Sequence, residues 1–85
     1  MKIYRVTIHE LFESDTFSYC ETLEVAKKQC YKAHDFVAGR FDEDDIKDYT
    51  VNECEDDYGN FYLDCEHKNG FGHSIHITEI ELFSE

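Results

Sequence analysis

Two cysteines and three histidines in the C-terminal half have side chains that can bind a metal ion. They are Cys54, Cys65, His67, His73 and His76. Two thiolates and two imidazoles form one of the ligand sets that bind tetrahedral Zn²⁺ in small structural sites. The spacing C-x10-C-x-H-x5-H-x2-H, however, lacks the closely paired cysteines of standard zinc fingers. Two interpretations therefore stay open: a structural zinc site, or ordinary buried thiols beside surface histidines.

A shared face for these residues depends on two hairpin turns. If tight turns are centred on residues 58–59 and 69–70, Cys54 lies opposite Leu63, and Leu63 lies opposite His76. Because side chains alternate along a strand, this register places the two cysteines and two of the histidines on one face. A shift of one residue would divide the set between two faces.

Other motifs in the chain give weaker indications of a site. Cys30 and His34 are four residues apart and could touch on a helix. We interpret Cys30 as a buried position in the apolar stripe of such a helix and His34 as a residue at the edge of that stripe. The acids that begin at Asp42 resemble a calcium loop, but Ile46 stands at a ligand position and Lys47 where glycine is needed. No nucleophile elbow, phosphate-binding loop or Cys-x-x-Cys is present. We expect no enzymatic activity; the alternative is a small hydrolase or nuclease built on carboxylates and histidines.

One amphipathic helix is predicted over residues 23–38. Thr22 is a suitable N-cap and Gly39 a suitable C-cap. Apolar residues recur between them at steps of three and four, as expected for one buried stripe. These residues are Leu23, Ala26, Cys30, Ala33 and Val37.

The rest of the chain predicts strands. Residues 2–12 alternate between apolar and polar side chains, and three further strands follow the helix. The later strands are expected at 49–55, 60–67 and 73–83, with a short additional strand at 17–20. This order predicts a single α+β domain over residues 1–85, arranged β-α-β-β-β, with the helix packed on a mainly antiparallel sheet.

The net charge of −12 is concentrated in the middle of the chain. Residues 41–66 hold eleven of the twenty acids and only one base, Lys47. Such a segment repels nucleic acid and anionic membranes and favours a basic protein partner. The alternative is a solvated face that maintains solubility. We expect the partner to contact Asp42, Glu43, Asp44, Asp45, Asp48, Glu55, Asp56, Asp57 and Tyr58.

The cysteines and the N-terminus indicate a cellular compartment. The four cysteines follow no apolar leader, and no stretch approaches the length of a membrane span. Reduced or metal-bound thiols are therefore expected, which is typical of the cytoplasm.

The whole chain resembles a class of small phage proteins in its pattern. It opens with the strand-like KIYRVTIHEL, continues with one helix, and closes on IHITEIELF. In this respect, and in its acidity, it is similar to the anti-CRISPR inhibitors of type II guided nucleases. The resemblance implies a protein of the cytoplasm of a bacterial host that blocks the positively charged nucleic-acid channel of a nuclease and so prevents DNA binding or cleavage. These inhibitors share no motif, so no site residue is carried over.

Overall fold

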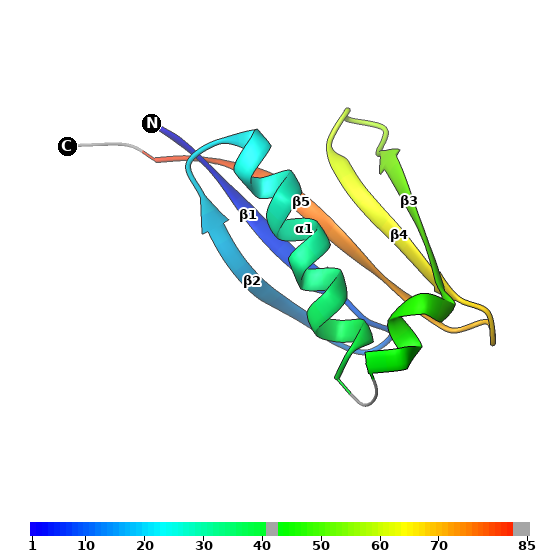
Figure 1. Ribbon diagram of the computed structural model, residues 1–85. Coiled ribbons are helices and arrows are strands. Elements are labelled where there is room, and N and C mark those ends of the chain that lie inside the picture. Colours follow the sequence, from blue (N-terminus) through cyan, green and yellow to red (C-terminus); the bar gives the residue numbers. More distant parts are fainter. Residues whose placement is uncertain (41–42, 83–85) are drawn as a thin grey trace.

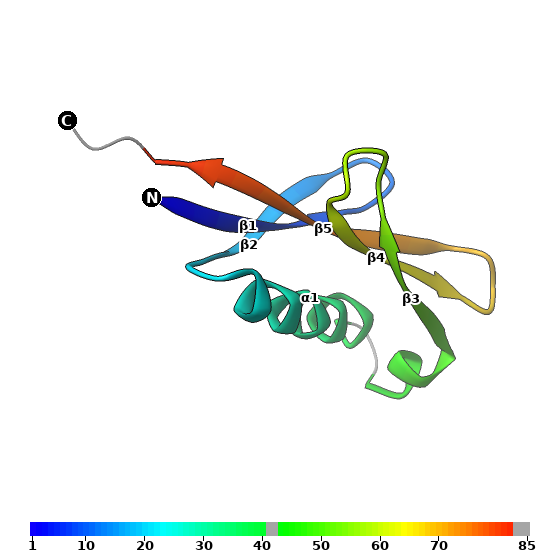
Figure 2. The same cartoon turned by 90° about the horizontal axis from the view of Figure 1, so that it is seen from above.

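The computed structural model describes residues 1–40 and 43–82, the side chains of residues 43–45 excepted. One α-helix, α1, packs on one face of a five-stranded antiparallel sheet, and none of the described residues forms a helix on the other face (Figures 1 and 2). The elements are β1 (Lys2–His9), β2 (Ser14–Cys20), α1 (Leu23–Ala38), the 3-10 helix η1 (Glu43–Asp48), β3 (Tyr49–Glu55), β4 (Phe61–His67) and β5 (Gly72–Glu81). The predicted α+β class, with one helix on a mainly antiparallel sheet, is confirmed.

The helix begins and ends where its caps predict. The Thr22 hydroxyl accepts a hydrogen bond from the backbone N–H of Val25 at 3.2 Å. At the other end, the Gly39 N–H donates to the carbonyl of Asp35 at 2.9 Å. Both bonds pair backbone groups that a helix end would otherwise leave unsatisfied. The position of α1 along the chain was therefore predictable from local sequence.

The sheet has the order β2-β1-β5-β4-β3. The short strand expected at 17–20 is present and begins earlier, at Ser14, so that β1 lies between β2 and β5. Val6, Leu63 and Ile75 are completely buried between the sheet and α1. β2 and β3 form the two edges of the sheet, and the hydroxyl of Tyr31 on α1 donates a hydrogen bond to the Glu53 carboxylate of β3.

The predicted register of both C-terminal hairpins is wrong by one residue. Cys54 lies opposite Tyr62, and Tyr62, rather than Leu63, lies opposite His76. The cause is loop length. Backbone bonds join residue 56 to 60 and residue 67 to 71, so each loop has three residues instead of two. Each loop ends in a glycine with positive φ, Gly59 at 81° and Gly70 at 94°, as three-residue hairpin loops require.

Candidate metal centre

The corrected register divides the five predicted metal ligands between the two faces of the sheet. Cys65 lies directly opposite His73 on the face that α1 covers, and both side chains are buried. Cys54 and His76 flank Tyr62 on the other face. The prediction that Cys54 and His76 share a face with Cys65 is therefore wrong, because a shift of one residue exchanges the faces of a strand.

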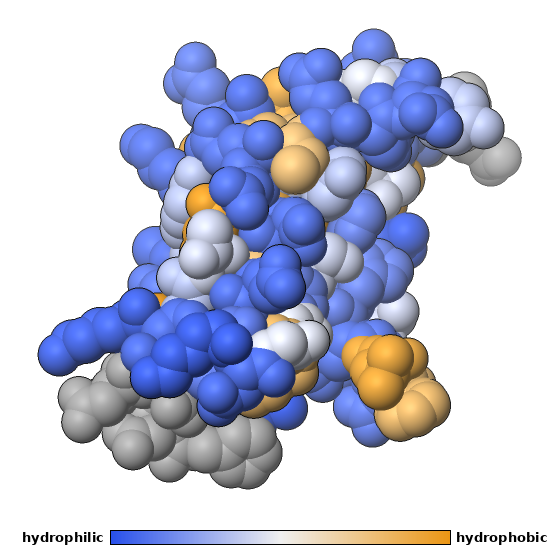
Figure 3. All heavy atoms as spheres, turned by 90° about the vertical axis from the view of Figure 1, so that its right-hand side faces the viewer, coloured by the Kyte–Doolittle hydropathy of each residue, from blue (hydrophilic) through white to orange (hydrophobic). Residues whose placement is uncertain are grey.

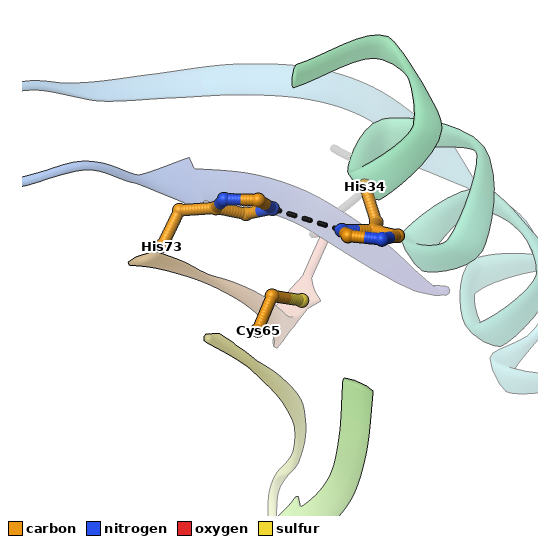
Figure 4. A group of neighbouring side chains, drawn as sticks. All are labelled: His34, Cys65 and His73. Atoms are coloured by element: carbon orange, nitrogen blue, oxygen red, sulfur yellow. Dashed lines mark hydrogen bonds between the residues drawn. The ribbon is translucent and has the colours of Figure 1, made fainter. Parts of the chain in front are cut away.

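α1 supplies a residue to this site that the sequence analysis placed elsewhere. His34 is buried, with only 4% of its surface exposed, so its assignment to the edge of the stripe is wrong. Its Nδ1 lies 3.0 Å from Nε2 of His73, and the Cys65 sulfur completes a compact group (Figure 4). The ligand atoms of His34, Cys65 and His73 all lie within 4.8 Å of one another. We call these three residues the His-Cys-His triad.

Three separate elements position the triad. Cys65 comes from β4, His73 from β5 and His34 from α1. Gly72 allows β5 to come close to β4 here, because a methyl group on Gly72 would lie only 2.2 Å from the Cys65 carbonyl oxygen. On α1, His34 follows the buried Cys30 by four residues, so it points to the same side of the helix. This i, i+4 spacing was the available sequence signal for His34.

His67 lies on the same face as Cys65 but is not part of the triad. Its Nδ1 accepts a hydrogen bond from the Asn69 N–H at 3.1 Å, and its ring stacks on Phe71 with a centroid distance of 4.2 Å. Its buried Nε2 lies 3.9 Å from the Asp48 carboxylate, beyond hydrogen-bond distance. Tyr49 packs between the histidines, with ring centroids 5.0–5.3 Å from those of His34, His67 and His73.

Burial keeps all three triad residues neutral at pH 7. Burial, together with His34 and the Arg40 charge, lowers the pKa of His73 to about 4. Burial also lowers the pKa of His34. Burial and the neighbouring Asp64 raise the pKa of the Cys65 thiol to about 12. The 3.0 Å contact between Nδ1 of His34 and Nε2 of His73 is a hydrogen bond, so one of these two nitrogens carries a proton in the metal-free chain. Metal binding therefore requires that ring to adopt its other neutral tautomer and the Cys65 thiol to lose its proton.

The triad has dimensions close to those of a zinc site. Zinc bonds of about 2.0–2.1 Å to nitrogen and 2.3 Å to sulfur place tetrahedral ligands about 3.3–3.6 Å apart. The two nitrogens, at 3.0 Å, already satisfy this within a few tenths of an ångström. The sulfur must approach by about an ångström at most, given the 4.8 Å limit on the group. Among the described residues, no fourth histidine, cysteine or carboxylate belongs to the group.

The residues on the uncovered face form a separate row. The rings of Tyr62 and His76 stack at 4.8 Å, and His76 meets His9 edge-on at 4.6 Å. The two histidines also bond neighbouring serine hydroxyls, His9 to Ser14 at 2.8 Å and His76 to Ser74 at 2.9 Å. Cys54 and His76 thus belong to this surface row and not to the buried triad.

Of the acidic residues expected to bind a partner, Asp42 and the side chains of Glu43, Asp44 and Asp45 lie outside the described part of the structure. Asp48, the last residue of η1 and directly before β3, pairs with Lys68 at 3.3 Å.

At the other end of β3, the Asp56 carboxylate accepts hydrogen bonds from the Tyr58 and Asn60 N–H groups, which lower its pKa. Glu55, Asp57 and Tyr58 are exposed there. The side of the molecule that carries β3 and β4 is mostly hydrophilic (Figure 3). Asp48 and Asp56 therefore stabilise the fold locally, which leaves Glu55, Asp57 and Tyr58 available at the surface.

Within residues 1–40 and 43–82, no helix is long and apolar enough to cross a membrane. No family model, no curated protein and no solved structure matches this chain.

Proposed function

We propose that this chain is a small zinc-binding domain in which the His-Cys-His triad holds one structural metal ion. The observation that supports the proposal is the convergence of three buried ligand atoms from α1, β4 and β5 within 4.8 Å. Buried histidine and cysteine side chains are the preferred ligands of zinc. An ion at this point would join the helix to the two strands beneath it and would add its binding energy to the stability of the domain.

A metal-content measurement tests this proposal. The purified protein, equilibrated with zinc and then desalted, should retain one zinc per chain by elemental analysis. Cys65→Ser and His73→Asn should reduce retention at least 10-fold, because each removes a ligand. Cys54→Ser and His76→Asn are matched controls on the opposite face and should retain the metal. Equal zinc retention by all four variants, or none by the native chain, would contradict the proposal.

A second function, compatible with the first, is supported by the charge distribution. We propose that the protein binds a basic surface of a nucleic-acid-handling protein, such as the channel of a type II guided nuclease, and excludes DNA from it. The support is the excess of acid between residues 41 and 66 of the sequence, of which Glu55 and Asp57 are exposed at the end of the edge strand β3 and in the loop after it. Tyr58 is 90% exposed beside the acids Glu55 and Asp57, where an aromatic side chain can anchor an interface.

Charge neutralisation tests this second proposal. Replacing Asp42, Glu43, Asp44 and Asp45 together by their amides should weaken inhibition of DNA cleavage by a guide-loaded type II nuclease about 10-fold or more, since four exposed pairs contribute up to about 1 kcal/mol each. Inhibition by the native chain should also weaken with added salt.

The matched control removes the same charge from the exposed acids of the N-terminal half, Glu13, Asp15, Glu21 and Glu24. This control should inhibit like the native chain. Absence of inhibition by the native protein at large excess would exclude this nuclease as the target, and equal inhibition by both variants would exclude the acidic segment as the contact.

A further inference from the structure

We propose that the metal held by the His-Cys-His triad keeps one open coordination position and binds a small anion, of the carboxylate type, from the adjacent cavity that Arg40 lines. This inference rests on the proposed zinc function. It adds a ligand-binding role to a site that would otherwise be purely structural. The argument depends on the number of ligands, the neighbouring cavity and the local charge.

The number of ligands leaves a position free. Tetrahedral zinc takes four ligands, and the described residues supply three. Structural zinc sites are normally closed by four protein ligands, whereas sites with three keep a position for water or a small molecule. The triad thus has the ligand count of an open site.

A cavity of about 200 Å³ borders the triad at His73; His34 and Cys65 are not part of its wall. His73 and Tyr49 form part of its wall, together with Glu10, Arg40 and Phe71. His73 is itself a triad residue, and the Tyr49 ring contacts both triad histidines, at centroid distances of 5.2 and 5.3 Å. A volume of this size accommodates an anion of a few heavy atoms. A molecule in the cavity would lie beside His73, one of the three proposed metal ligands.

The charge of the loaded site favours an anion. A zinc ion brings two positive charges, of which the Cys65 thiolate neutralises one. Arg40 adds a positive charge at the cavity wall, and Glu10, 3.5 Å from the Arg40 guanidinium, neutralises one. One positive charge remains in the partly enclosed site, where the effective dielectric constant is below that of water. A monovalent carboxylate could bind the metal with one oxygen and pair with the Arg40 fork with the other.

The experiment uses the full chain loaded with Co²⁺, which replaces zinc in such sites and is visible by absorption spectroscopy. Azide and acetate are the probes. Each should change the visible cobalt bands with a saturating 1:1 titration. Arg40→Gln should weaken acetate binding about 10-fold while cobalt binding is retained. Lys32→Gln removes a positive charge from the exposed side of α1 and is the matched control.

The outcomes separate this inference from the proposed function. If the thiolate-to-cobalt absorption band never appears, the triad does not bind metal, and both the proposed zinc-binding function and the anion-binding inference are wrong. If the band appears but neither anion alters the visible spectrum, the metal site stands and its open position is refuted. If the anions bind equally well to the native chain and to Arg40→Gln, the cavity wall has no part in anion binding and the inference is equally refuted.

Discussion

Saturating zinc should raise the free energy of unfolding of this domain by about 4 kcal/mol, with a rise in Tm of about 15–30 °C. These values correspond to a free zinc concentration about a thousand times the Kd, for a domain of this size. The physical reason is that the three ligands come together only in the folded chain. They are 31 and 8 residues apart in sequence, so an unfolded chain rarely brings them within bonding distance.

The measurement is thermal unfolding by circular dichroism, with zinc and with a chelator. Cys65→Ser should unfold at nearly the same temperature in both conditions, because it lacks the thiolate. Cys54→Ser keeps the triad intact and should respond like the native chain. Each protein is compared with itself in the two conditions, so any effect of a mutation on intrinsic stability cancels. A Tm of the native protein that zinc leaves unchanged would refute the stabilising role.

Local signals predicted most of the elements of the fold. The bounds of α1 follow from Thr22, Gly39 and the apolar stripe, which act within a few residues of one another. The alternation in the strands likewise predicted β3 over Tyr49–Glu55. The position of β1 inside the sheet depends on long-range pairing with β2 and β5, which local sequence does not determine.

The candidate site was harder to predict, because it depends on register and on one tertiary contact. The turns at Gly59 and Gly70 fit either a two-residue or a three-residue loop, and this choice alone decides which face Cys54 and His76 occupy. To predict that His34 belongs to the site, the orientation of α1 on the sheet would have to be known. The place of His34 beside His73 depends on how α1 lies across the sheet, and the sequence pattern does not give that orientation.

The two proposed functions use different parts of the molecule and can be separated. The triad lies beneath α1, while Glu55, Asp57 and Tyr58 lie at the exposed end of β3 away from η1. Loss of the metal should affect partner binding only through the stability of the fold. Neutralising the acidic residues should leave metal retention unchanged. Measuring both properties on both sets of variants therefore shows whether either function depends on the other.

Acidification should destabilise the metal-free domain, and His73 should account for about 2–3 kcal/mol of the loss between pH 7 and pH 4.5. The pKa of His73 is lowered to about 4 in the folded chain, mainly by burial, and is about 6.5 when unfolded. Between these values the unfolded chain binds a proton that the folded chain does not. The free energy of unfolding therefore falls as the pH decreases through 6.5 and levels off only below about 4.

Urea unfolding at pH 7.0 and 4.5, in chelator, measures this loss, and the comparison with His73→Asn isolates its source. The asparagine variant does not titrate at this position, so its loss between the two pH values should be smaller by about 2–3 kcal/mol. Protonation of the many surface carboxylates also occurs near pH 4.5 and reduces the repulsion from the net charge of −12. That effect is common to both proteins and cancels in the difference. An equal loss in the two proteins would mean that His73 takes up its proton in the folded chain as readily as in the unfolded one.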